Sequence, residues 1–121
     1  PKANEEPVEQ VEEAHITAEP LPALQFIPIE PLMVSLGAAA NGRQLRFEGY
    51  LEVNPAHFQE VNDLMPRIMD VLNTYLRAVD YSDIEEPTSL LKLRLQMLRR
   101  VQIVVGDGRV NDLLVSKFLL S

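Results

Sequence analysis

The sequence predicts a small α+β domain in which an antiparallel or mixed sheet of about three strands packs against two helices. Three observations support this fold class: an alternating pattern in residues 43–53, helical apolar spacing in residues 54–78 and again in residues 88–105, and an apolar strand pattern in residues 110–120. A strand with one apolar face needs neighbouring strands and an apolar cover, and the other segments can supply both.

Residues 43–53 alternate between apolar and polar side chains with a period of two, as a strand with one solvated face does. The apolar positions are Leu45, Phe47, Gly49, Leu51 and Val53. The intervening positions are Gln44, Arg46, Glu48, Tyr50 and Glu52. This stretch is therefore the strand around which we expect the domain to be organised.

Residues 24–36 predict a first strand that is kinked by Pro28 and Pro31, because proline cannot donate a ladder hydrogen bond and favours edge positions. Residues 37–42 join it to the second strand. Asn41 and Gly42 tolerate positive φ, so they predict a hairpin turn.

The first helix is expected to begin at Asn54 and Pro55, since asparagine caps free amide groups and proline fits the first helical position. Pro66 lies inside the helical pattern, where it removes a hydrogen bond and clashes with the preceding turn. We therefore expect a kink or short break at residues 63–65 and a helix that continues to about residue 78.

Residues 80–87 predict a polar connection, followed by a second helix over residues 88–105 with Thr88 or Ser89 as its cap. Its main apolar stripe consists of Leu90, Leu93, Met97, Val101 and Val104. Gly106 and Gly108 are expected to end the helix.

Residues 110–120 predict a last strand with apolar side chains on both faces. An uninterrupted alternation places Leu114, Phe118 and Leu120 on one face and Leu113, Val115 and Leu119 on the other. Two hypotheses follow: this is an inner strand of the sheet, or its second face meets a partner.

Residues 1–23 predict an acidic, proline-rich tether, and residues 24–121 predict a single α+β domain. The net charge of −7 is uneven, because residues 1–30 contain seven acidic residues against Lys2 while residues 31–121 contain eleven acidic and ten basic residues. Neither part has the basic excess of a nucleic-acid-binding protein, so we expect no nucleic-acid partner.

The sequence predicts neither a catalytic residue nor a metal or cofactor site. It has no cysteine and only two histidines, His15 and His57, which are too few for a zinc site at ordinary ligand spacing. No serine has the surroundings of a catalytic nucleophile. We therefore expect a protein that is not an enzyme.

Two sets of residues are candidates for binding a partner. The first set is basic and lies outside the apolar stripes of the second helix: Arg94, Arg99 and Arg100. The second set is Leu113, Val115 and Leu119 of the last strand. The arginines can remain solvated, contact another protein, or bind a lipid headgroup or small ligand, and salt-sensitive flotation with anionic liposomes separates the lipid hypothesis from the others.

Five segments of the chain carry a family resemblance: residues 26–36, 42–53, 64–72, 75–84 and 110–120. In this order they resemble the FliL family of flagellar basal-body-associated proteins. One departure is the sequence Glu85-Glu-Pro-Thr-Ser before the second helix, where many members have Thr-Pro-Glu-Gly.

The resemblance implies a single-pass protein of the bacterial inner membrane whose membrane helix precedes Pro1 and whose domain lies in the periplasm at the flagellar basal body. It also implies a fold similar to the stomatin and prohibitin domain, self-association into a ring, and association with the stator units of the motor. The family offers no catalytic residue to transfer.

Overall fold

The sheet is built around β2 (Gln44–Val53), the strand in the alternating segment. In the computed structural model, which describes residues 23–37 and 40–121, β2 pairs antiparallel with β1 (Gln25–Ser35) and with β3 (Val110–Leu120). Within the described residues the strand order is β1-β2-β3. The predicted α+β class is confirmed, and the sheet is antiparallel and not mixed.

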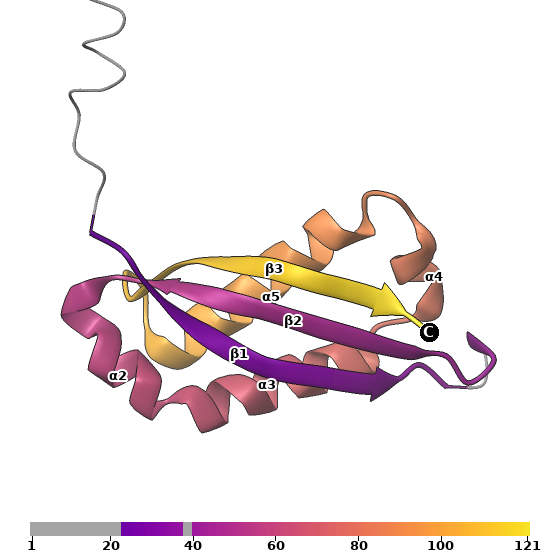
Figure 1. Ribbon diagram of the computed structural model, residues 1–121, viewed down its shortest axis with the longest axis horizontal. Helices are drawn as coiled ribbons and strands as arrows, with labels where there is room; N and C mark the ends of the chain where they lie inside the picture. Colours follow the sequence, from indigo (N-terminus) through magenta and orange to yellow (C-terminus); the bar gives the residue numbers. More distant parts are fainter. Residues whose placement is uncertain (1–22, 38–39) are drawn as a thin grey trace, which may run out of the picture.

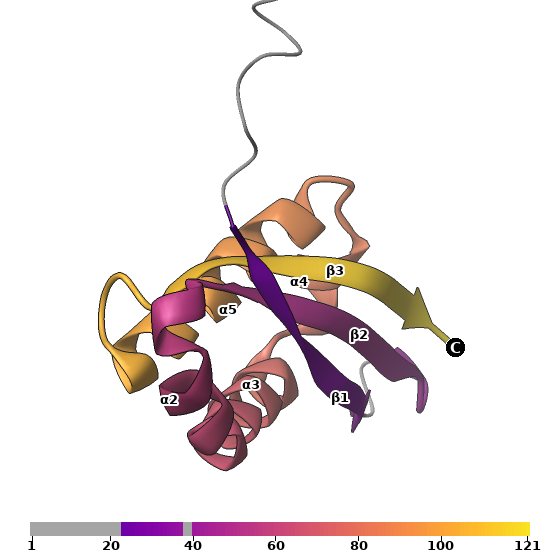
Figure 2. The ribbon, with the colours of Figure 1, turned by 60° about the vertical axis from the view of Figure 1, so that its left-hand side comes forward.

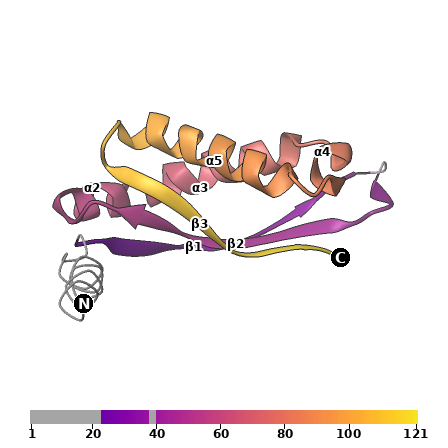
Figure 3. The same ribbon diagram turned by 90° about the horizontal axis from the view of Figure 1, so that it is seen from above.

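The helices lie together on one face of this sheet, so the described part of the domain has two layers (Figure 3). The helical segments are η2 (Pro55–His57), α2 (Phe58–Asp63), α3 (Met65–Ala78), α4 (Tyr81–Glu85) and α5 (Ser89–Val105). α3 lies behind β1 and α5 crosses behind β3 (Figures 1 and 2).

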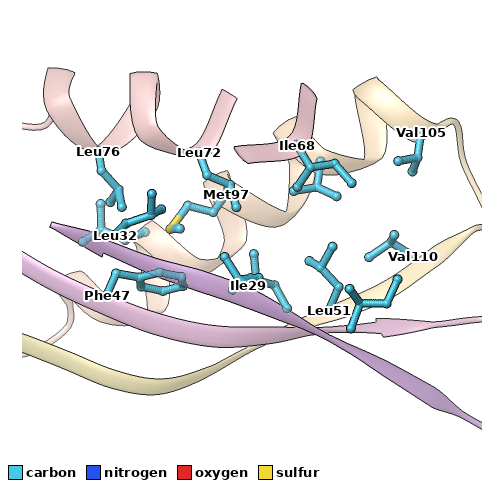
Figure 4. Packing of buried hydrophobic residues seen from close by; sticks show 14 of the residues in the cluster. Ile29, Leu32, Phe47, Leu51, Ile68, Leu72, Leu76, Met97, Val105 and Val110 are labelled. Atoms are coloured by element: carbon cyan, nitrogen blue, oxygen red, sulfur yellow. The ribbon is translucent and has the colours of Figure 1, made fainter. Parts of the chain in front are cut away.

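The hydrophobic core lies between these layers. The predicted inner face of β2 is confirmed, because Leu45, Phe47, Leu51 and Val53 are completely buried. Figure 4 shows Leu72 and Leu76 of α3 directed toward the sheet, together with Met97 of α5. Residues spaced three and four apart on each long helix thus cover the apolar face of the sheet.

The first helical segment begins and breaks where the sequence predicted. Asn54 Oδ1 accepts a hydrogen bond of 2.9 Å from the backbone N–H of Ala56. The helix is interrupted at Leu64, and Pro66 lies in the first turn of α3, where its missing N–H costs no intrahelical bond. The prediction of a break at residues 63–65 is therefore confirmed.

The turn between β1 and β2 has the predicted backbone at Asn41 and Gly42, whose φ angles are 56° and 73°. They are the central residues of a tight turn, which is closed by a hydrogen bond of 3.1 Å from the Arg43 N–H to Ala40 O. The predicted tether, residues 1–23, lies outside the described residues except for Ala23.

The predicted polar connection between the long helices contains the short helix α4, which was not predicted from the sequence. The backbone N–H of Asp83 donates to Asp80 O at 3.0 Å, and Ile84 is buried among the core residues. One apolar side chain therefore anchors a turn of otherwise polar residues.

The predicted cap of the second helix is correct in its position, because Thr88 is the N-cap residue, but not in its hydrogen bond. Neither Thr88 nor Ser89 caps it through a side chain, since no such hydrogen bond forms at the N-cap and Ser89 is buried with its Oγ donating to Ile84 O at 2.9 Å. Leu90, predicted in the apolar stripe, is exposed, whereas Leu93, Met97 and Val101 are buried as expected.

β3 is an edge strand among the described residues, so the hypothesis of an inner strand is wrong. Its two faces also differ from the prediction. Lys117 pairs with Glu48 and Val115 pairs with Gly49, so Ser116 is an extra residue that forms a β-bulge. The bulge shifts the alternation by one position.

As a result, Leu113, Val115, Phe118 and Leu120 all lie opposite inner-face residues of β2, whereas Leu119 lies opposite Arg46 on the other face. The three candidate residues are therefore divided between two faces: Leu113 and Val115 lie on the inner face, and Leu119 lies on the other.

Candidate functional site

Arg94, the first of the candidate arginines, is directed from α5 toward β3. Its Nη1 lies 3.3 Å from Asp112 Oδ1 and 3.5 Å from the carbonyl oxygen of Leu113. Both side chains of the ion pair are about one third exposed. Arg94 therefore links the helix to the edge strand.

Arg99 and Arg100 have different surroundings. Arg99 lies 3.8 Å from Asp107 in a pair that is largely solvated. Arg100 donates to Gln96 Oε1 at 2.8 Å and lies 4.4 Å from the centre of the Tyr75 ring of α3. Burial raises the pKa of Tyr75, with positive Arg100 opposing and Asp83 reinforcing the shift.

The structure does not bring the three arginines onto one surface. At 3.6 residues per turn, Arg99 and Arg100 lie about 140° and 240° around the helix from Arg94. Arg94 contacts β3, Arg100 contacts α3, and Arg99 reaches Asp107 beyond the end of α5. Their predicted role in binding a partner remains a prediction, and it applies to three separate surfaces.

A double-mutant cycle measures what the contact of Arg94 with β3 contributes. We expect Arg94→Met and Asp112→Asn to show a coupling of about 0.5 kcal/mol in the free energy of unfolding, because the pair is only partly screened by solvent. Urea denaturation of the two single variants and the double variant gives this value.

The matched control is the cycle of Arg99→Met with Asp107→Asn, for which we expect a coupling near zero because both side chains are mostly exposed. Equal coupling in the two cycles would contradict the linking role of Arg94.

The candidate residues of β3 are also distributed over different environments. Leu113 is completely buried in the core, Val115 packs against the core while partly buried, and Leu119 is 53% exposed. Of the three, Leu119 is the one available to a partner on the uncovered sheet face.

That sheet face carries apolar side chains that the sequence analysis did not select. Phe26 and Met33 of β1 and Tyr50 of β2 are exposed, in addition to Leu119 of β3. Met33, Arg46 and Leu119 form one cross-strand row. The signal was present in the alternation of the first strand, where Phe26 directly precedes the buried Ile27 and Met33 lies between the buried Leu32 and Val34.

Two mostly apolar grooves of the described residues lie beside α5. One has a volume of about 390 Å³ and runs between α3 and α5, bordered by Tyr75, Arg100 and the exposed Ile103. The other has a volume of about 450 Å³ and lies between α5 and β3, bordered by Leu90, Leu91, Arg94, Leu114 and Val115. Both are mostly apolar in their lining residues, which is typical of surfaces that contact other proteins or apolar ligands.

A small charged cluster joins the end of α5 to α2. His57 lies beside Glu60, with Nδ1 3.3 Å from Oε1. Arg109 was not predicted from the sequence as part of this cluster; its Nε lies 3.0 Å from Glu60 Oε2 without hydrogen-bond alignment. Arg109 also donates through Nη1 to the carbonyl oxygen of Val105 at the last turn of α5. These contacts hold the turn before β3 in place.

Within residues 23–37 and 40–121, no three His, Asp or Glu side chains are grouped as metal ligands. Among the same residues, no helix is long and apolar enough to cross a membrane.

Comparison with known proteins gives the family. The family model described as "Flagellar basal body-associated protein FliL" matches residues 26–120. Proteins called "Flagellar FliL protein" from two strains of Caulobacter vibrioides are 31% identical to the chain over 62 residues, which make up 51% of this chain and 30% of each relative. The matched part is therefore less than a third of the length of these relatives.

The family model, in contrast, extends from the beginning of β1 to the end of β3. The chain belongs to the FliL family of flagellar basal body-associated proteins.

Proposed function

We propose that the protein is a non-enzymatic component of the flagellar basal body that associates with the stator units of the motor and stabilises them. In this proposal the domain lies on the periplasmic side of the bacterial inner membrane, connected to a membrane anchor by the acidic segment of residues 1–23. Copies of the chain associate with one another into a scaffold, with a ring as the expected form.

The observation that carries this proposal is the family match over residues 26–120, which includes all three strands and both long helices. The surface of the domain supports a role in binding other proteins. Large apolar side chains are exposed on the uncovered sheet face and along α5, including Phe26, Met33 and Leu95. Exposed apolar surface of this kind is a common feature of protein interaction sites.

A genetic test follows from the proposal. In a motile bacterium that encodes this protein, we expect deletion of its gene to reduce swimming speed and the number of labelled stator units at each flagellar base. Re-expression of the full-length protein should restore both. Copurification of the stator proteins with the tagged protein, and not with the tag alone, measures the association directly.

Normal stator occupancy and normal swimming under viscous load in the deletion strain would contradict the proposal, because a stabilising component matters most when the motor carries load.

A further inference from the structure

The two edges of the described sheet differ in their ability to accept another strand. The β1 edge contains Pro28 and Pro31 and is interrupted by a register shift between Ile29 and Leu32. β3 also contains a bulge, so the difference between the two edges is proline, which protects an edge from further pairing because it cannot donate a ladder hydrogen bond. β3 has no proline over Val110–Leu120, and no other strand of the described residues pairs with its outer side. We call this side the open edge of β3.

The backbone of β3 presents hydrogen-bonding groups along the open edge. Gln44 and Ser121 exchange two backbone hydrogen bonds of 2.9 Å, so the alternation of an antiparallel ladder turns the N–H and C=O groups of Leu120 and Phe118 outward. Beyond the bulge, the carbonyl of Leu114 lies against Gly49 of β2. The backbone groups of its neighbours Leu113 and Val115 therefore also face outward. Those of Leu113 already have partners in the same chain, because its N–H donates to Asp112 Oδ1 at 2.8 Å and its C=O accepts from Arg94 Nη1 at 3.5 Å. A second strand would have to displace these two contacts at Leu113.

An apolar overhang lies above the open edge. The N-terminal half of α5 extends past β3 (Figure 1), and the groove of about 450 Å³ between them is bordered by Leu90, Leu91, Leu114 and Val115. Leu91 is 58% exposed. A strand added to β3 would have its inner side chains covered by this part of α5.

The sequence of β3 is suited to pairing with itself. Residues 113–120 read Leu-Leu-Val-Ser-Lys-Phe-Leu-Leu, so three apolar residues precede and three follow a central polar pair. In an antiparallel pair of identical strands this pattern places Leu113 opposite Leu120, Leu114 opposite Leu119, and Val115 opposite Phe118.

In the same register, residues with outward backbone groups lie opposite one another: Leu113 opposite Leu120, and Val115 opposite Phe118. This match depends on the bulge at Ser116, which separates Val115 from Phe118 by three residues and not by two. Apolar side chains meet on both sheet faces.

The charges are compatible with this arrangement. Lys117 is the one charged residue of residues 113–120, and its position in the self-pair is unfavourable by itself, because the centre of an interface is typically depleted of charge. At the centre of the self-pair, Lys117 lies opposite Ser116 of the second copy. Each Lys117 also has Glu48 beside it in the sheet, which offsets the repulsion between the two lysines.

We infer that the open edge of β3 binds β3 of a second copy of the chain, antiparallel and with Leu114 of one copy opposite Leu119 of the other. The inference deepens the self-association in the proposed function and rests on it. The contact is two-fold symmetric and closes at two copies, so a ring needs a second surface between such pairs.

Engineered cysteines test the register, because the natural sequence has no cysteine. In the inferred dimer, the thiol of a Leu114→Cys copy lies opposite the thiol of a Leu119→Cys copy. The two positions form a pair without ladder hydrogen bonds, where the short Cα separation permits a disulfide. Each variant of the 121-residue chain carries an N-terminal histidine tag and is attached through it to phosphatidylcholine vesicles that contain a nickel-chelating lipid. The two variants are mixed on the same vesicles and then oxidised.

We expect the mixture to give at least fivefold more cross-linked dimer than either variant alone. Equal yields from the mixture and from the single variants, or no cross-linked dimer at all, would overturn the inference.

A second measurement uses a matched pair of substitutions. Leu119→Asp and Met33→Asp both place a carboxylate beside Arg46, at opposite edges of one cross-strand row, and the original side chains are 53% and 48% exposed. We expect Leu119→Asp to weaken self-association at least tenfold, measured by analytical ultracentrifugation, while Met33→Asp changes it less than twofold. Equal effects of the two substitutions would overturn the inference.

The outcomes also separate this inference from the proposed function. Cross-linking in the expected register in a protein that leaves stator occupancy unaffected contradicts the proposed function alone. Normal association with stator units by a chain that never pairs through β3 contradicts the inference alone.

Discussion

Leu93→Asp is expected to unfold the domain. Leu93 is 4% exposed and packs in the core between α5 and the sheet, so the substitution leaves an unpaired carboxylate in an apolar environment and removes packing contacts. The combined cost is expected to exceed about 4 kcal/mol, a large part of the stability of a domain of this size. Circular dichroism during heating should show no cooperative unfolding transition, and a strain that carries this variant should swim like the deletion strain.

Leu95→Asp is the matched control, because Leu95 lies two residues away on the same helix and is 52% exposed. Its melting temperature is expected to stay within a few degrees of the unsubstituted protein, since an exposed substitution typically changes stability by less than about 0.5 kcal/mol. A cooperative transition of Leu93→Asp at the melting temperature of Leu95→Asp would contradict the placement of Leu93 in the core.

Local patterns in the sequence were sufficient to predict most of the elements. The period of two in residues 43–53 gave the buried face of β2, and Asn41 with Gly42 gave the hairpin turn. Pro66 gave the interruption at Leu64. Each of these features depends on the chemistry of residues close together in the chain, so no knowledge of the tertiary structure was needed.

Features that depend on contacts between distant segments were not predicted. The bulge at Ser116 cannot be seen in an alternating pattern, because it exists only in the register of β3 against β2. One extra residue moved Leu119 to the face opposite Leu113 and Val115. Strand order also depends on which strands pair, so the edge position of β3 was not accessible from its apolar composition.

The arginines of α5 illustrate the same limit for the candidate site. Their spacing along one helix shows that they avoid the apolar stripe, but it does not show which element lies beside each of them. The structure places Asp112 beside Arg94 and Tyr75 beside Arg100, and these partners come from β3 and α3. α4 was missed for a different reason, because its five residues are too few to show a helical period.

Gly49→Ala is expected to separate β2 from β3 at the bulge. A Cβ at position 49 would overlap the carbonyl oxygen of Leu114, which is a backbone atom and cannot move without shifting the strand. The expected loss is about 3 kcal/mol or more in the free energy of unfolding, measured by urea denaturation.

Gly108→Ala is the control for the general cost of replacing a glycine. Gly108 has a φ of 85° and nothing within 4 Å of an added Cβ, so its substitution brings only the backbone penalty of a left-handed conformation, about 1 kcal/mol. Gly49 has no such φ, and the loss of stability on its substitution must come from the close approach of two strands.

The same displacement would disturb the outward backbone groups of Leu113 and Val115, so Gly49→Ala should weaken self-association as well as stability, whereas Gly108→Ala should affect stability alone. Equal destabilisation by the two substitutions would show that strand contact at Gly49 does not set the position of β3.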